Sequence, residues 1–104
     1  MQTHLIYVTT KDKDEARTIG RSLVASHLVA CVNIFAGVAS IYYWKDDLQE
    51  DQEAVLIAKT TENRIPDVIA AIRQQHSYDC PCIVSFPIAQ GHDGFLNWIA
   101  EQVQ

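Results

Sequence analysis

Several features that define large classes of protein are scarce in this sequence, and positive charge is the first of them. The chain has eight lysine and arginine residues and thirteen acidic ones, so its formal net charge is −5, and the basic residues form no cluster in the sequence. Because contacts to a phosphate backbone need clustered lysine and arginine, we expect no nucleic-acid partner. Apolar runs such as residues 28–32 are far too short to span a bilayer. Residues 1–15 show no basic leader and no small-residue cleavage site, so we expect a cytoplasmic protein without a membrane partner.

Cysteine and glycine are also scarce, and their spacing excludes further classes. Cys31, Cys80 and Cys82 are an odd number of cysteines, so a disulfide framework is not expected. The C-x-C spacing of the last two matches neither a redox C-x-x-C pair nor a zinc knuckle. There is no H-E-x-x-H, no glycine-rich phosphate loop and no Ser-His-Asp pattern. A Cys80–His76 nucleophile pair is the one catalytic alternative; we expect no enzyme and no organic cofactor.

The sequence does contain a duplicated pattern within one domain of residues 1–104. LIYVTT at residues 5–10 and LIAKTT at residues 56–61 share four of six letters, and both are typical of strands. Asp12 and Glu15 predict a capping box at the start of the helix after the first copy. Helical stripes follow both copies: Ala16, Ile19, Leu23, Val24 and His27 in the first, and Ile65, Val68, Ile69 and Ile72 in the second. Strand-like segments then follow at residues 28–43, with a bulge at 36–37, and at residues 82–88.

This βαβ–βαβ order predicts an α+β fold, the ferredoxin-like split βαβ sandwich. The first strands of the two copies would lie antiparallel at the centre of the sheet, the second strands at its edges, and the helices on one face. An extra C-terminal helix is predicted after Gly91, with Phe95, Leu96, Ile99 and Val103 buried and Trp98 beside them. Cys31 and Cys82 would begin opposite edge strands, so we expect them to be far apart within one chain.

A long hairpin is predicted between the two copies, with residues 42–53 at its tip. These residues carry five of the thirteen acidic side chains, and they lack the glycine and oxygen spacing of a calcium loop. One interpretation is a solvated tip whose charges prevent strand association. The other is a hairpin that reaches a neighbouring subunit, where Tyr42, Tyr43 and Trp44 are buried.

Five short motifs in register resemble the CutA family of divalent-cation tolerance proteins over nearly the whole chain. They are ACVNI (30–34), SIYYW (40–44) followed by the acidic run and Glu53, LIAKTT (56–61), H-x-Y-x-x-P (76–81), and P-I-x-x-G with F-L-x-W-I (87–99). The resemblance implies a cytoplasmic homotrimer that is linked to copper tolerance and binds metal ions. Its trimeric design is similar to that of the PII signalling proteins, which bind small effectors between subunits.

This chain departs from the family pattern at three positions. The family usually has glycine where Asp46 stands, proline where Ser77 stands, and glutamate where Cys82 stands. Asp46 can still adopt left-handed backbone angles at some cost. Cys82 replaces a hard carboxylate with a soft thiol, so a thiol pair in this loop would be a property of this chain.

Four residues are predicted metal ligands, with copper as Cu(I) or Cu(II) the expected ion. Cys80 and Cys82 are two residues apart in an extended segment, so both thiols could meet one soft metal; alternatively Cys82 packs inward and Cys80 is exposed. Cys31 is either a small buried hydrophobe or a soft ligand. His76 is a helix C-cap, a pocket residue or a ligand. Any site that shares Cys31 and Cys82 would have to lie between subunits.

A ligand pocket at a subunit boundary is the second prediction. Lys59 lies on a predicted central strand where lysine needs an anionic partner, which could be Glu53, a carboxylate of a neighbouring subunit or a bound anion. Tyr78 would stack or donate its hydroxyl, and Pro81 would fix the entry into the last strand. The predicted pocket consists of Trp44, Glu53, Lys59, His76, Tyr78, Pro81 and Trp98.

Three functions remain open on the sequence. The first is a trimeric metal-binding protein of divalent-cation tolerance. The second is a PII-like trimeric sensor of a small anion that uses Lys59, His76 and Tyr78. The third is a trimeric scaffold or anchor for another protein.

Overall fold

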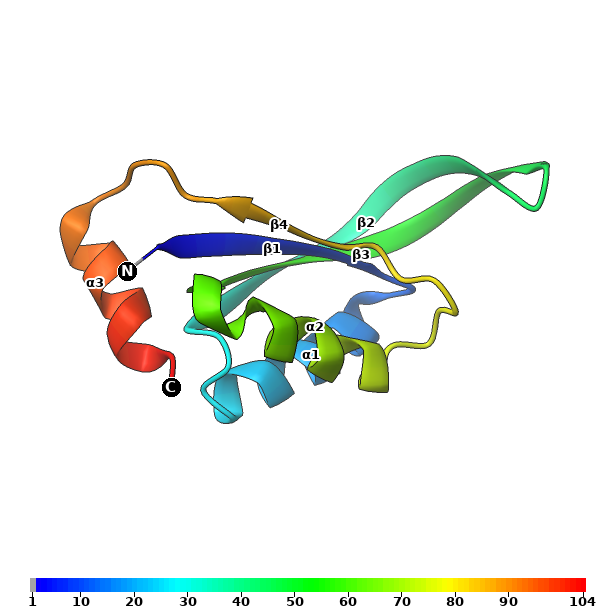
Figure 1. Cartoon of the computed structure of the whole chain (residues 1–104). Helices are drawn as coiled ribbons and strands as arrows, with labels where there is room; N and C mark the ends of the chain where they lie inside the picture. The colour runs from blue at the N-terminus through cyan, green and yellow to red at the C-terminus, as the bar shows by residue number, and fades with distance from the viewer. Residues whose placement is uncertain (1) are drawn as a thin grey trace.

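Residues 2–104, which the structure describes, repeat a strand–helix–strand unit twice and end in a third α-helix. The structure is a computed structural model. In chain order the elements are β1 (Thr3–Thr10), α1 (Lys13–Ala25), β2 (Cys31–Trp44), β3 (Asp47–Thr61), the 3-10 helix η1 (Glu62–Arg64), α2 (Ile65–Gln75), β4 (Ile83–Pro87) and α3 (Asp93–Gln102). Figure 1 shows α1 and α2 together on one face of the sheet, α3 at the end where β1 begins, and a long β2–β3 hairpin projecting from the other end.

The sheet has the strand order that the duplication predicts. Its order is β2-β3-β1-β4, and every pairing is antiparallel. The two strands that share the repeated letters, β1 and β3, are therefore central and adjacent, with Leu5 opposite Lys59 and Val8 opposite Leu56. The α+β split βαβ fold is confirmed.

The core lies between the sheet and the two helices that cover it. Ile6 and Val8 of β1 and Leu56 and Ala58 of β3 are fully buried, because alternate residues of a strand point to the same face. The side chains between them point to the opposite face, which no helix covers in Figure 1. We call this second face the open face of the sheet.

Helix α1 packs on the sheet through a close contact at Gly20. A Cβ atom at this position would lie 2.9 Å from Val32 Cγ2 and 3.2 Å from Leu56 Cδ1, so the glycine allows the helix backbone to approach the sheet. The helix begins as predicted: the Asp12 side chain accepts a hydrogen bond from the backbone of Glu15 at 2.8 Å. The reciprocal bond of a capping box is shifted by one residue, because Glu15 accepts from the backbone of Lys11.

The predicted buried stripe of α1 is wrong at its C-terminal end. Ala16, Ile19 and Leu23 are buried, but Val24 is 37% exposed. The helix ends at Ala25, and His27 follows with a positive φ of 60°. The backbone leaves its helical path there, so the 3.6-residue period no longer places His27 beneath the helix.

The β2–β3 hairpin has a much shorter turn than the sequence predicts. A bulge occurs between Phe35 and Val38, as predicted, and Gly37 has a φ of 69°. Beyond it, pairing continues to Trp44 opposite Asp47. The turn is only Lys45-Asp46, and both residues have positive φ, as the tight hairpin turn that matches strand twist requires. The acidic segment that was predicted to form the tip is therefore mostly strand.

The C-terminal helix is also more exposed than predicted. Ile99 is fully buried, whereas Phe95 is 43% and Trp98 is 37% exposed. Their rings stack on each other, with centroids 5.6 Å apart and an interplanar angle of 28°. Phe95 therefore shields Trp98 on the surface and is not part of the core.

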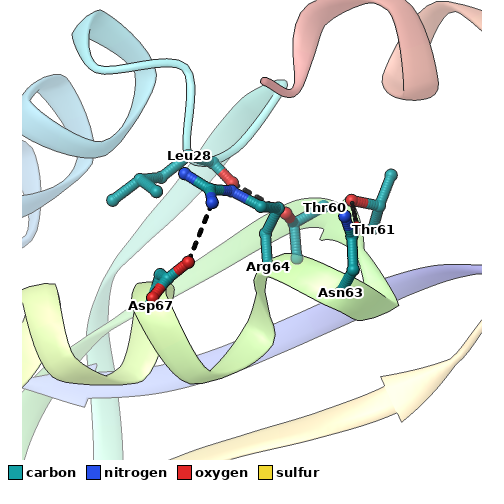
Figure 2. Close-up of polar contacts among 6 residues, drawn as sticks. All are labelled: Leu28, Thr60, Thr61, Asn63, Arg64 and Asp67. Carbon is teal, nitrogen blue, oxygen red and sulfur yellow. Dashed lines mark hydrogen bonds and ion pairs between the residues drawn. The ribbon is translucent and has the colours of Figure 1, made fainter.

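Side-chain hydrogen bonds fix the junction between β3 and α2 (Figure 2). The Thr60 hydroxyl donates to the Leu28 carbonyl at 2.7 Å, and the Thr61 hydroxyl donates to Asn63 at 2.6 Å. Arg64 forms an ion pair with Asp67 at 2.9 Å across the first turn of α2. The Thr60 bond ties the segment after α1 to the end of β3, and the other two contacts are local to the start of α2. The two repeated units are therefore joined through this connection as well as through their paired strands.

Candidate functional site

A groove runs along the open face of the sheet and along β2 of the hairpin as far as Trp44, the residue before the turn. It has a volume of about 600 Å³, within the range of small-molecule sites. Its floor comes from the open-face residues of β1 and from the hairpin, and one wall comes from the loop between α2 and β4. The lining residues are Tyr7, Thr9, Ser40, Ile41, Tyr42, Trp44, Glu53, Tyr78, Asp79, Cys80 and Cys82.

A nearly buried carboxylate is among the residues that line this groove. Glu53 is only 9% exposed, and its Oε2 accepts a hydrogen bond from the Tyr78 hydroxyl at 2.7 Å. Burial of the phenol, followed by this bond and the negative charge of Glu53, raises the pKa of Tyr78 far above 10. Tyr78 therefore remains a protonated donor throughout the physiological range and fixes the position of the Glu53 carboxylate.

His76 holds the loop that carries Tyr78. Its backbone N–H donates to the Ile72 carbonyl at 2.9 Å, so it caps α2. Its Nδ1 accepts from the backbone N–H of Tyr78 at 3.1 Å, and its Nε2 lies 2.7 Å from the Thr9 carbonyl. Since a backbone N–H can only donate, Nδ1 is the acceptor and Nε2 carries the proton. Metal ligation by His76 would require one of these bonds to break.

A second tyrosine–carboxylate pair lies on the hairpin. The Tyr42 hydroxyl donates to Asp51 Oδ2 at 2.7 Å. This hydrogen bond, with smaller contributions from desolvation and from the charges of Asp51 and Glu53, raises the pKa of Tyr42. Tyr42 and Tyr78 thus both present neutral rings to the groove, with their hydroxyls turned toward acids.

The cysteines divide between the two edges of the sheet. Cys80 and Cys82 are exposed, are not in a disulfide, and line the groove. Cys31 lies on β2, in the row of Lys59, Leu5 and Phe86 across the sheet. Three strand spacings separate the two edges, about 14 Å. Cys31 cannot share an ion with Cys82 of the same chain, as expected, and within residues 2–104 no three His, Cys, Asp or Glu residues gather closely enough to hold one.

The other predicted pocket residues lie outside the groove lining. The Lys59 ammonium donates to the Asn33 side-chain oxygen, and Glu53, one of its three predicted partners, bonds to Tyr78 instead. Pro81 lies between the two groove cysteines. Trp98 is on α3, stacked on Phe95. Of the predicted pocket residues, the groove thus includes Trp44, Glu53 and Tyr78.

Several groove residues were not predicted from the sequence. Tyr7 and Thr9 alternate with the buried Ile6 and Val8, so the two-residue period of β1 could have assigned them to the open face. Tyr42 was predicted only as a subunit contact, and its bond to Asp51 depends on the hairpin register, which the sequence does not reveal.

Glu15 links the start of α1 to the loop that precedes the groove. Its two carboxylate oxygens accept from the backbones of Lys11 at 3.0 Å and Ser77 at 2.9 Å. Partial burial alone would raise the pKa of Glu15, but the hydrogen bonds from Lys11 and Ser77 outweigh it and lower the pKa below its usual value. The charged carboxylate is therefore the form that the fold stabilises.

We expect Glu15→Gln to lower the free energy of unfolding at pH 7 by about 1 kcal/mol. A pKa that is lower in the folded state stabilises the protein above the unfolded-state value, and this stabilisation is lost as the pH falls through the folded-state value. Urea unfolding of both proteins between pH 3 and pH 7 should therefore show a difference that disappears in acid. Asp14→Asn, an exposed neighbour in the same turn, is the control, and a pH-independent difference for Glu15→Gln would contradict this role.

The fold and the groove together define a ferredoxin-like α+β protein with an elongated hairpin and an acidic, aromatic, thiol-bearing groove. Residues 4–102 match the family described as CutA1 divalent ion tolerance protein. The chain therefore belongs to the CutA family of divalent-cation tolerance proteins, a name that describes tolerance to ions and not an enzymatic reaction.

Relatives and solved structures agree with this assignment over nearly the full chain. The divalent-cation tolerance protein CutA of Thermus thermophilus is 40% identical over 97 residues, covering 93% of this chain and 94% of the relative. A structure of CutA1 from Oryza sativa superimposes with a TM-score of 0.97 at 31% identity, covering 100% of this chain and 95% of that one. The structure described as the periplasmic divalent cation tolerance protein CutA of Archaeoglobus fulgidus has a TM-score of 0.95 at 35% identity, with 98% and 99% covered. No helix within residues 2–104 has the length and apolar character needed to cross a membrane.

Proposed function

We propose that this chain is a homotrimeric divalent-cation tolerance protein that binds copper, with its metal sites at subunit boundaries. The observation that carries the proposal is the pair of exposed thiols, Cys80 and Cys82, in a groove whose other charged residues, Glu53 and Asp79, are acidic. The family assignment supplies the link to divalent cations.

The chemistry of the thiol pair favours a soft ion. Thiolates bind Cu(I) strongly, and Cu(I) accepts low coordination numbers, whereas Zn²⁺ requires four ligands in a structural site. Cys80 and Cys82 are separated only by Pro81, which restricts the backbone between them. Carboxylates nearby, such as Asp79, would serve Cu(II) or another divalent ion less selectively.

The placement of the remaining thiol supports a site between subunits. Cys31 lies on the opposite edge of the sheet from Cys82, so only a second copy of the chain could bring such thiols together. The hairpin offers apolar surface for that assembly, because Ile41 is 65%, Tyr43 is 73% and Leu48 is 59% exposed. Exposed apolar patches of this kind are typical of interaction surfaces.

A PII-like anion sensor has less support. Of its three expected residues, Tyr78 donates to a carboxylate, both His76 ring nitrogens are bonded within the chain, and Lys59 lies outside the groove. An anion entering the groove would meet Glu53 and Asp79. A purely scaffolding role would not account for the two exposed thiols in the groove.

We also infer that the protein resides in the cytoplasm. Three free cysteines, two of them exposed, suit a reducing compartment. One solved structure of the family is described as periplasmic, so cell fractionation is the test of this inference. Release of the protein together with a periplasmic marker on osmotic shock would refute the inference.

Light scattering combined with a Cu(I) titration tests the proposal. Under anaerobic, reducing conditions the protein is expected to have three times the 11.7 kDa chain mass and to take up copper at a fixed ratio per chain. Copper uptake should compete with a chromogenic Cu(I) chelator. A stable monomer that binds copper as tightly as the native protein would contradict sites at subunit boundaries, and a trimer without copper affinity would remove the metal role.

A further inference from the structure

The loop that carries the two exposed thiols is attached to one residue of β1 at both of its ends. At the first end, His76 Nε2 donates to the Thr9 carbonyl at 2.7 Å. At the other end, the backbone N–H of Thr9 donates to the Cys82 carbonyl at 3.4 Å. Opposite residues of a regular antiparallel pair exchange both backbone hydrogen bonds, but β4 begins only at Ile83. The imidazole therefore takes the second of these bonds, and both contacts lie within one chain.

Two further bonds hold the first part of this loop, residues 76–82. The Nδ1 atom of His76 accepts from the backbone N–H of Tyr78 at 3.1 Å, and the two rings pack with centroids 4.7 Å apart. The backbone N–H of Ser77 donates to Glu15 Oε2 at 2.9 Å, which ties the same segment to the first turn of α1. Only residues 79–81 remain between this anchored part and the other end of the loop.

The same bonds restrict what the imidazole of His76 can do toward a metal ion. A histidine binds a metal through the lone pair of a ring nitrogen. Nε2 carries its proton in the bond to Thr9, and the lone pair of Nδ1 is used by the Tyr78 N–H. Ligation would release part of the loop, whereas a ring that stays in place leaves a pair of thiols. Two thiolates suit Cu(I) better than Zn²⁺, which requires four ligands in a structural site.

We propose that His76 is a positioning residue for the Cys80–Cys82 thiol pair and not a ligand of the ion. The imidazole holds the α2 end of the loop against Thr9 and thereby sets the two thiols in the arrangement that receives the ion. Its effect on affinity rests on the proposed metal function, whereas the ring geometry and the order of the loop are properties of the copper-free chain.

Nitrogen-15 NMR of protein with labelled imidazole nitrogens tests the ring geometry. At pH 8 we expect a protonated Nε2 and an unprotonated Nδ1 for His76 in the copper-free protein, and the same pattern after Cu(I) is added. The opposite tautomer in the copper-free protein would overturn the proposal. A His76 nitrogen signal that changes on loading to that of a metal-bound imidazole would also overturn it.

Two variants of His76 separate positioning from ligation. His76→Gln keeps a side-chain N–H that can donate to the Thr9 carbonyl, whereas His76→Ala keeps neither ring bond. In copper-free protein, we expect the heteronuclear NOE of the Cys80 amide to fall in His76→Ala and to be largely restored in His76→Gln. The affinity for Cu(I), measured by chelator competition, should fall about tenfold in His76→Ala and less than about threefold in His76→Gln.

Gln74→Ala is the matched control, because Gln74 is exposed in the last turn of α2, and it should change neither readout. An amide is a poor ligand for a soft ion, so equal losses of affinity in His76→Gln and His76→Ala would indicate ligation and overturn the proposal. Unchanged order of the loop in His76→Ala would overturn it as well. A native protein without affinity for Cu(I) would refute the proposed function, and the order of the loop in the copper-free variants would then decide the positioning role by itself.

Discussion

Replacement of Cys80 and Cys82 by serine is expected to reduce the affinity for Cu(I) by about a hundredfold or more. Serine has nearly the shape of cysteine but provides a hard hydroxyl oxygen, which is a poor ligand for a soft ion. Both cysteines are exposed and outside the core, so the double variant should fold with unchanged stability. Competition with a Cu(I) chelator measures the affinity, and urea unfolding checks the fold.

Cys31→Ser is the comparison that tests the arrangement of the thiols. If Cys31 of one chain completes a site on another, its loss lowers the affinity by a smaller factor and does not abolish binding. If Cys31 is only a small half-buried hydrophobe, the variant binds copper as the native chain does. Unchanged copper affinity in the Cys80→Ser/Cys82→Ser protein would remove this loop from any metal function.

Truncation of Leu23 should produce the largest loss of stability. Leu23 is fully buried on the face of α1 that packs against the sheet, so Leu23→Ala removes apolar contacts and leaves a cavity. Such changes in well-packed cores cost about 2–5 kcal/mol. Chemical denaturation at one fixed protein concentration measures the change, because assembly would make the midpoint depend on concentration.

The adjacent residue provides the control for that prediction. Val24 is predicted from the helical period to share the buried face but is 37% exposed. Val24→Ala should therefore cost less than about 1 kcal/mol. Equal losses for the two variants would mean that α1 is rotated from its observed position, or that Val24 is covered in an assembly; a repeat at lower protein concentration distinguishes the two.

The sequence was sufficient to predict the arrangement of the sheet because its strongest signals are local. The repeated LIYVTT and LIAKTT segments are rich in strand-forming residues, and the helix after each has a clear apolar stripe. Once these elements are given, a short chain has few ways to bury both stripes on one sheet. The bulge near Gly37 was predicted for the same reason, since glycine inside a strand often marks a bulge.

The long hairpin was predicted, but the full length of its strands and its two-residue turn were not. Acidic residues have low strand propensity, so residues 47–53 resembled a loop. They are strand because pairing with β2 continues to the turn, where Lys45 and Asp46 both accept positive φ. Pairing between the two strands therefore overrides the low strand propensity of the individual acidic residues.

The groove was predicted only in part, because its contacts join residues that are distant in sequence. Glu53 and Tyr78 are 25 residues apart and meet only after α2 and the loop that follows it are in place. His76 was predicted as a site residue, but its bond to the Thr9 carbonyl spans 67 residues and could not be anticipated. Lys59 was assigned to the pocket from its unusual position on a central strand, and the structure shows only that it lies on the open face, beyond the groove.

Diffraction from crystals of the Cu(I)-loaded protein at the copper absorption edge tests the central claim most directly. We predict an anomalous peak about 2.3 Å from the Sγ atoms of Cys80 and Cys82, at a boundary between chains of a trimer. A peak within one chain away from these thiols, or ordered Cys80 and Cys82 side chains with no copper beside them, would contradict it.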